Sequence, residues 1–365
     1  MDGILFERFI ELSLADSLQV ALLGFIGGVL SGFIGSGGAF FMTPGMMNLG
    51  VPGVVAVGSN ITHKFGKAMM GSKKHGEYGN VDKRLAWFLV ATSFIGIRLA
   101  VWINSSLFKG GAGDHGAGAS AAADLYISAV FICILSLVAL SMLRDTFSRS
   151  EEEEGPSMKI AEFLSRVHLP PYIYFKVADV RVSLWLLLVV GLATGYLAGT
   201  IGVGGFIGVP AMIYVFGVPT AVAAGSELYL AMFMGAWGAL NYAYQGFVDL
   251  RLMMLLYLGS LLGVFIGAYG VKVVKERIIR IVTGTVIMIC VVSRAIAVPM
   301  YLRQLGWIGG RPEWDVYFNQ ASKAMLFAAG LSGMAIILHS VVRAYRQRRR
   351  IQTALLELRE VPQAA

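Results

Sequence analysis

Long apolar stretches alternate with short polar segments along this sequence. A helix needs about 20 mostly apolar residues to cross the hydrocarbon core of a bilayer. Stretches of this kind occupy residues 17–34, 84–106, 124–144, 183–201, 251–271, 277–298 and 322–342. The pattern therefore predicts an all-α polytopic membrane protein.

A glycine-rich break follows the first apolar stretch in each half of the chain. After each break comes a short apolar piece that ends at Gly50 or Gly217, and then a longer piece over 53–75 or 220–245. The short pieces are too short to span a bilayer comfortably, and paired broken helices recur in membrane transporters. Each half is therefore expected to contain a broken or re-entrant helical hairpin.

The two halves of the chain repeat each other. Residues 24–100 align without gaps onto residues 191–267 at a constant offset, with about two dozen identities. The predicted organisation is a first transmembrane repeat, a cytoplasmic linker, a second transmembrane repeat, and an end segment with an outer loop, one extra C-terminal transmembrane helix and a basic tail. These four parts cover residues 1–144, 145–182, 183–298 and 299–365.

Lys and Arg residues mark opposite ends of the two repeats. The first repeat carries them at the end of its hairpin, at Lys73, Lys74, Lys83 and Arg84, and the second carries them one loop later, at Lys272, Lys275 and Arg277. Basic loops face the cytoplasm. Two inverted repeats are therefore expected, with the N-terminus outside and the C-terminus in the cytoplasm, in a multi-pass protein of the cell inner membrane.

The linker 145–182 has a composition of its own. It contains the acidic run Glu151–Glu154 and the stretch Met158–Leu164, and it ends at Pro170-Pro171. An amphipathic helix on the membrane surface is expected there. A plain tether and a regulatory segment both fit this composition.

Composition excludes several other classes of protein. Hydrophobic residues make up 56% of the chain and charged residues 14%, unlike an ordinary soluble domain. The formal charge is +8, but the basic residues lie in loops and in the tail, so membrane topology accounts for it and no nucleic acid partner is expected. The histidines lack metal-ligand spacing and no phosphate loop is present, so neither a metal nor a cofactor is predicted.

The strongest candidate site is the duplicated glycine motif at the two breaks. It reads Gly35-Ser36-Gly37-Gly38 in the first half and Gly202-Val203-Gly204-Gly205 in the second. The N–H groups at the start of a short helix can bind an anion. Close packing of helices through small residues is the alternative reading. On the first reading, Ser36, Gly37, Gly38, Val203, Gly204 and Gly205 contact the substrate.

The second arms of the two hairpins carry polar groups in otherwise apolar segments. Further substrate-binding candidates are Ser59, Asn60, Thr62, His63, Lys64 and Ser226. Glu227 is an isolated acid in an apolar segment, so it is expected to couple or gate the site by exchanging a proton, or else to be a structural partner of His63, Lys64 or Arg98. Arg98 lies within a predicted span, where it either neutralises an anion or pairs with an acid. Lys64 has a second reading, in which it extends toward the cytoplasmic surface.

Two repeated turns precede spans, and each contains an aspartate. They are Gly79-Asn80-Val81-Asp82 and Gly246-Phe247-Val248-Asp249. Asp is well suited to cap the helix that follows. A structural role is therefore expected for both.

The duplicated glycine motif, the repeated Gly-Val-Pro turn, the Gly-Ser that follows it and the repeated Gly-x-Val-Asp resemble the TauE/SafE family of sulfite exporter-like permeases. The resemblance covers about residues 18–298. It implies a two-half carrier in the inner membrane that exports sulfite or an organosulfonate. Residues 60–67 are more polar than the usual pattern of that family, and their cationic character suits an anion.

The expected function is export of a small sulfur-containing anion such as sulfite or an organosulfonate. The expected partners are that anion, the lipid bilayer and protons. Another oxyanion or a carboxylate is the alternative cargo. An intramembrane enzyme would require a nucleophile and a base, or metal ligands, on facing spans, and no such set is visible in the sequence. No enzymatic activity is therefore expected.

Overall fold

The computed structural model describes residues 12–34, 38–110, 118–148, 169–202, 204–274 and 276–360, and these are mostly helical. The first half contains α1 Leu14–Ile34, α2 Ala39–Asn48, α3 Gly53–Glu77, α4 Lys83–Gly110 and α5 Gly118–Ser148. The second half contains α7 Leu184–Ile201, α8 Gly205–Pro210, the π-helical turn η2 Ala211–Val215, α9 Thr220–Tyr244, α10 Leu250–Val273 and α11 Glu276–Gln304. Helix α12, Glu313–Glu360, follows outside the repeat.

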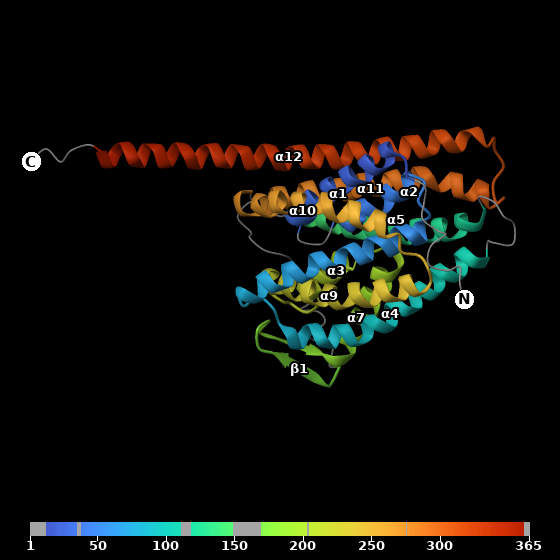
Figure 1. Cartoon of the computed structure of the whole chain (residues 1–365). Coiled ribbons are helices and arrows are strands. Elements are labelled where there is room, and N and C mark those ends of the chain that lie inside the picture. The colour runs from blue at the N-terminus through green and yellow to red at the C-terminus, as the bar shows by residue number, and fades with distance from the viewer. Residues whose placement is uncertain are drawn as a thin grey trace, which may run out of the picture.

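Seven helices in the described part of the chain are long and apolar enough to cross a membrane. They are α1, α4, α5, α7, α10, α11 and α12, which are the helices that the seven apolar stretches predict. The chain is a multi-pass membrane protein. Helix α12 is longer than its predicted span over 322–342, and its C-terminal part extends beyond the rest of the bundle (Figure 1).

The short pieces after the glycine breaks are separate helices, as expected. In the first half α2 and α3 meet at Gly50, and in the second half α8 and η2 lead to α9 through Gly217. Both glycines have positive φ angles, 85° and 74°, which glycine adopts without strain. The backbone continues as a π-helical turn after Pro210, a residue that has no N–H to donate to the preceding turn. Broken hairpins are therefore present in both halves.

The helices of the two halves pair reciprocally. The most extensive contacts join α1 to α10, α4 to α7, α3 to α9, and α5 to α11 (Figure 1). Glycines allow two of these pairs to approach closely, because a Cβ at Gly28 would lie 2.5 Å from the Ser260 carbonyl oxygen and one at Gly195 would lie 2.2 Å from that of Ser93. In the repeat, Gly28 corresponds to Gly195, and Ser93 to Ser260. Each half therefore packs its first helix against the other half through equivalent residues.

A β-hairpin precedes α7. Strands β1 Tyr172–Phe175 and β2 Val180–Ser183 pair antiparallel, and the hairpin lies at one end of the bundle below α7 and α4 in Figure 1. Buried Phe175 packs edge-on against Phe88 of α4, and the Asp82 carboxylate accepts hydrogen bonds from the N–H groups of Val177 and Ala178. The end of the predicted linker is thus a hairpin attached to the bundle, which the sequence pattern did not predict. The predicted amphipathic stretch 158–164 lies outside the described residues.

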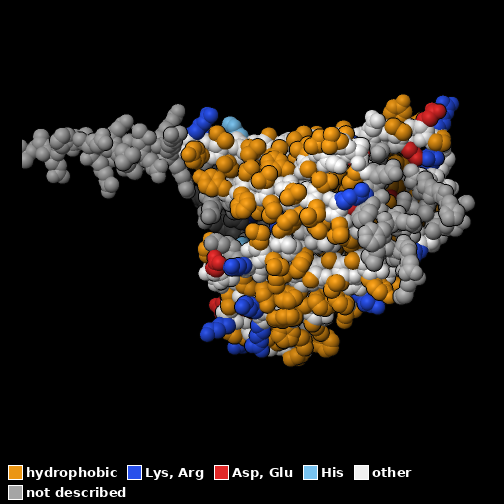
Figure 2. All heavy atoms as spheres, viewed as in Figure 1, with side chains coloured by type: hydrophobic (Ala, Val, Ile, Leu, Met, Phe, Trp, Pro, Cys, Tyr) orange, Lys and Arg blue, Asp and Glu red, His pale blue; other side chains and the backbone are white. Residues whose placement is uncertain are grey.

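The outer surface suits a lipid environment. Hydrophobic side chains cover much of the face shown in Figure 2, and lysines and arginines gather mainly toward its left edge. Large apolar residues of α10 such as Leu258, Leu262 and Phe265 are exposed. In water, apolar exposure of this extent would lead to association, whereas lipid chains cover it.

Candidate functional site

The centre of the candidate site is a buried pair of opposite charges between the two halves. Lys64 of α3 places its Nζ atom 3.9 Å from Oε1 of Glu227 in α9, and their side chains are 8% and 2% exposed. Both groups lie against the second glycine break. A Cβ at Gly204 would be 3.3 Å from the Lys64 Nζ atom, and one at Gly208 would be 2.2 Å from Oε2 of Glu227. Two glycines therefore leave the space that these charged groups occupy.

Asn60 of α3, in the first half, lies at the same glycine break. Its Nδ2 atom donates to the Thr43 hydroxyl at 2.8 Å and to the Ala39 carbonyl at 3.4 Å, and the Thr43 hydroxyl donates to the Ile201 carbonyl at 3.1 Å. A Cβ at Gly202 would lie 3.3 Å from Asn60 Nδ2. Helices α2, α3 and the end of α7 thus converge there. The Asn60 Oδ1 atom is buried and has no hydrogen-bond donor in the described part of the chain.

Lys67 and His63 point from α3 toward α1 and α10. The Lys67 ammonium donates to the Ser31 hydroxyl of α1, and a Cβ at Gly38 would lie 3.0 Å from the Ser31 Cβ atom. His63 Nε2 lies 2.6 Å from the Ser260 hydroxyl of α10. The ammonium groups of Lys64 and Lys67 therefore lie near the second and the first glycine break, respectively.

Lys67 was not among the candidates from the sequence. The signal that could have found it is its spacing, because residues three apart on a helix share a face and Lys64 was already a candidate. The polar stretch of α3 therefore supplies two cationic groups at the site.

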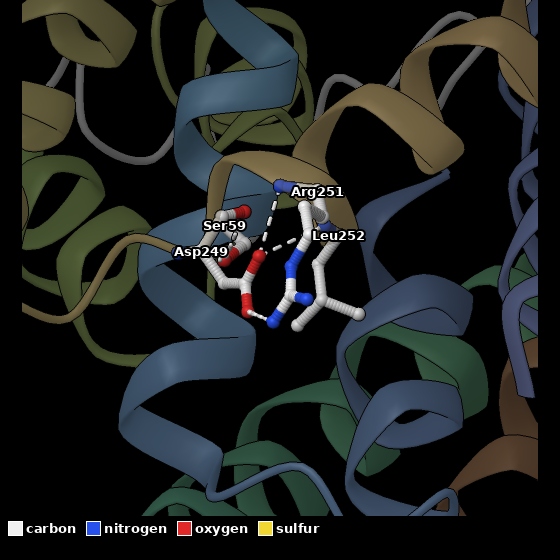
Figure 3. A network of polar contacts seen from close by, with 4 residues as sticks. All are labelled: Ser59, Asp249, Arg251 and Leu252. Carbon is white, nitrogen blue, oxygen red and sulfur yellow. Dashed lines mark hydrogen bonds and ion pairs between the residues drawn. The ribbon is translucent and has the colours of Figure 1, made fainter. Parts of the chain in front are cut away.

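Ser59 and Ser226 bind backbone in the opposite half. The Ser59 hydroxyl accepts from the Asp249 N–H at 3.1 Å, as Figure 3 shows from close by, and the Ser226 hydroxyl accepts from the Asp82 N–H at 2.9 Å. Both hydroxyls are therefore engaged in holding the turns before α10 and α4. The third candidate hydroxyl, that of Thr62, donates to the Gly58 carbonyl within α3 at 2.8 Å.

The predicted capping role of the two aspartates is confirmed. Asp249 Oδ1 accepts from the N–H groups of Arg251 and Leu252 at 2.8 and 3.2 Å (Figure 3). Asp82 Oδ1 accepts from the Leu85 N–H at 3.0 Å. Each repeated turn therefore begins a helix and also receives a serine from the other half.

Arg98 does not join the buried cluster. It is exposed on α4, and its Nη1 atom lies 3.5 Å from the Asn241 Oδ1 atom. Of the three partners considered for Glu227, the structure places Lys64 beside the carboxylate, whereas His63 contacts Ser260 and Arg98 contacts Asn241.

The glycine motifs lie at the starts of α2 and α8. Gly38 has φ 58° and accepts through its carbonyl from the N–H groups of Phe41 and Met42. Gly204 precedes α8, whose first residue is Gly205. The first N–H groups of a helix have no acceptor within it, so they can contribute donors beside the Lys64 ammonium. The candidates Ser36, Gly37 and Val203 lie outside the described residues.

A second buried polar cluster lies at the tip of the first hairpin, and the sequence analysis missed it. Asp124 of α5 accepts at 2.7 Å from the Gly53 N–H at the start of α3, and Arg294 of α11 interacts electrostatically with this carboxylate. Arg294 is 1% exposed and donates to the Tyr301 hydroxyl at 3.0 Å. Both Asp124 and Arg294 fall within predicted spans, where an ionisable residue is itself a signal that could have identified them.

Helix α12 contacts the same hairpin tip through hydroxyl and amide groups. The Ser322 hydroxyl donates to Asn48 Oδ1 at 3.1 Å, and the Ser293 hydroxyl donates to the Ser322 carbonyl at 2.7 Å. The helix outside the repeat is therefore bonded to the end of α2. No group of three or more His, Cys, Asp or Glu side chains that could hold a metal occurs among the described residues.

Chemically, the central cluster can bind a small anion. It combines two ammonium groups, an amide and the start of a helix, with one carboxylate that offsets part of the positive charge. Ammonium groups and backbone N–H groups donate hydrogen bonds and cannot accept them, so an acceptor-rich ligand complements them. The apolar residues around the cluster strengthen such electrostatic contacts.

Comparison with known proteins gives a consistent set of matches. A family model described as "Sulfite exporter TauE/SafE" matches residues 20–294. The chain is 25% identical over 275 residues to "Probable membrane transporter protein YjnA" of Bacillus subtilis (strain 168), an alignment that covers 75% of this chain and 97% of that protein. It is 22% identical over 270 residues to "Probable membrane transporter protein YdhB" of the same organism, covering 72% and 94%. No solved structure matches the chain.

Proposed function

Because the chain belongs to the TauE/SafE family of membrane transporters, we propose that it exports a small sulfur-containing anion, such as sulfite or an organosulfonate, through a site centred on Lys64. The observation that carries this proposal is the burial of the Lys64 ammonium at the second glycine break. Burying a charge within a membrane protein is costly, so such residues commonly serve a pathway or a ligand. An anion that enters the site would receive this charge.

The donors around Lys64 and the family description support the proposed substrate class. Sulfite and sulfonate groups present several oxygens in a compact anion, and each oxygen can accept from the Lys64 ammonium or from the first N–H groups of α8. The two curated relatives are described as probable membrane transporters without a substrate. Another oxyanion or a carboxylate offers the same acceptor chemistry and is the alternative cargo.

The transport cycle that we propose uses two halves of inverted orientation in the inner membrane, with the N-terminus outside. The reciprocal pairing of α1 with α10 and of α4 with α7 supports two structurally equivalent halves. The opposed basic loops support inversion. Substrate would reach the Lys64 region from the cytoplasm and leave outward, and the inside-negative potential favours that direction for an anion. Glu227 is the proposed proton-exchanging residue.

Flux measurements in proteoliposomes test the proposed function. Vesicles containing the purified protein are assayed with sulfite, sulfoacetate, taurine, thiosulfate and lactate. Saturable flux of sulfite or sulfoacetate, but not of zwitterionic taurine, is the expected result. Saturation only by lactate would assign the carboxylate alternative, and flux of none of these compounds would contradict the proposal.

A pair of lysine substitutions locates the site. Lys64→Gln removes the buried charge and is expected to weaken substrate affinity by at least about tenfold, the effect of losing roughly 1.4 kcal/mol of binding free energy. Lys73→Gln is the matched control, because Lys73 lies on the same helix and is exposed. Equal kinetics for the two variants would show that the site lies elsewhere.

A further inference from the structure

The Glu227 carboxylate is held unusually loosely for a buried acid. The residue is 2% exposed, and neither carboxylate oxygen accepts a hydrogen bond from any described residue. The Oε1 atom of Glu227 lies 3.9 Å from the Nζ atom of Lys64, which is longer than a hydrogen bond. Asp249, which is also 2% exposed, instead accepts two backbone hydrogen bonds and lies 3.8 Å from an Arg251 nitrogen. Asp249 is therefore fixed in place, whereas Glu227 lacks comparable support.

The space beside Glu227 depends on Gly208. A Cβ on Gly208 would lie 2.2 Å from Oε2 and 2.9 Å from Cδ of Glu227, and the carboxylate atoms are the nearest atoms to that position. In the repeat, Gly208 corresponds to Phe41, and Glu227 corresponds to Asn60. The second half thus has a carboxylate and a glycine that makes room for it. At the equivalent positions the first half has an amide and a large phenylalanine side chain.

We propose that the Glu227 carboxylate occupies, in the unloaded transporter, the position at the Lys64 ammonium that an oxygen of the transported anion takes, and that the substrate displaces it. This inference rests on the proposed function. A carboxylate oxygen and a sulfite or sulfonate oxygen are equivalent acceptors for one ammonium group. A carboxylate without hydrogen-bond donors is held weakly, so an anion that presents several acceptor oxygens to the Lys64 ammonium can replace it.

Competition of this kind has a measurable consequence. When a site is occupied by an internal competitor for part of the time, the apparent dissociation constant rises in inverse proportion to the fraction of free sites. Removing the carboxylate charge of Glu227 should therefore tighten substrate binding. If Glu227 were only a permanent counter-ion of Lys64, it would repel the anion through space. Glu227→Gln would then also tighten binding, whereas Glu227→Asp, which keeps the charge, would change binding little.

Equilibrium binding of sulfite to the purified full-length protein in detergent tests the inference. Glu227→Gln keeps the length of the side chain and is expected to lower the dissociation constant by about fivefold or more. Glu313→Gln, on the exposed start of α12, is the matched control and should leave binding unchanged. Lys64→Gln should weaken binding both alone and together with Glu227→Gln.

A second variant covers the case in which Glu227→Gln does not fold. Glu227→Asp retains the charge but withdraws it from Lys64 by one methylene group, so it should also tighten sulfite binding. Unchanged or weaker binding in the folded Gln or Asp variant, with normal binding by the wild type, would overturn the inference and leave the proposed function standing. If the wild type bound neither sulfite nor sulfoacetate, the proposed function itself would fail.

Discussion

Gly208 and Glu227 depend on each other at the scale of single residues. The carboxylate leaves no room for a side chain on Gly208, since a Cβ there would lie 2.2 Å from Oε2. Gly76 is also a glycine within a helix, but a Cβ there would meet no atom within 4 Å. Both glycines can be replaced by alanine. Gly76→Ala reports the helix preference of alanine alone, whereas Gly208→Ala adds the steric conflict with the Glu227 carboxylate.

Gly208→Ala is expected to destabilise the protein by about 1–3 kcal/mol, the usual cost of overpacking a filled site. In a Glu227→Ala background the added methyl group has room, so the cost should largely disappear. Reversible denaturation in mixed micelles measures the four combinations. Gly76→Ala is the control, and it should leave the protein as stable as the wild type or slightly more stable, because its methyl group enters open space. Equal costs in the two backgrounds would show that the carboxylate does not occupy the space beside Gly208.

At the scale of elements, the first hairpin is fastened at its tip to three helices outside it. Asp124 of α5 holds the start of α3, the charge of Arg294 in α11 interacts with that carboxylate, and Ser322 of α12 bonds to Asn48 at the end of α2. Thr220 corresponds to Gly53 in the repeat, and among the described residues the N-cap of α9, Pro219, makes no side-chain capping hydrogen bond. The two hairpins are therefore anchored differently, although their helices are equivalent.

Arg294→Leu is expected to lower the free energy of unfolding by about 1–3 kcal/mol, because it removes the hydrogen bond to the buried Tyr301 hydroxyl and a positive charge that interacts with Asp124. Adding Asp124→Asn should recover part of this loss, since an amide oxygen can still accept from Gly53. Denaturant titration in micelles measures both variants. Arg98→Leu serves as the control, because Arg98 is exposed and contacts Asn241; an equal loss there would contradict a special role for Arg294.

At the scale of the whole molecule, a group of exposed basic residues from different elements lies at one end of the helix bundle. Exposed basic residues lie at the end of α3, at the start of α4 and in the β-hairpin, namely Lys73, Lys83, Arg84, Lys176 and Arg181. The α3–α4 turn and the hairpin are joined by the Asp82 carboxylate, so these residues belong to one end of the bundle. This end is expected to face the cytoplasm.

Reporter fusions test the resulting topology. A fluorescent protein fused after Ala365 should fluoresce, because that reporter matures in the cytoplasm, and alkaline phosphatase at the same place should be inactive. Phosphatase inserted between α4 and α5, within residues 111–117, should be active. The reverse pattern at both places would overturn the proposed orientation, because the basic loops would then face outward and not the cytoplasm.

Local sequence determined the helices, the breaks between them and the turns. Span length and glycine-rich breaks are properties of neighbouring residues, so the predicted spans agree with α1, α4, α5, α7, α10 and α11 to within several residues. The repeat is visible when the sequence is compared with itself. Capping by Asp82 and Asp249 also depends only on residues nearby in the chain. The polar stretch 60–67 was visible for the same reason.

Tertiary structure alone decided which of these polar groups meet. Lys64 and Glu227 lie on different halves, and no local pattern distinguishes Lys64 from His63 or Arg98 as the partner of Glu227. Pairing of α3 with α9 makes that choice, because helix packing sets which faces come together. The same reason explains why the contact of Asp124 with Gly53 was missed, since α5 and the start of α3 become neighbours only in the folded bundle.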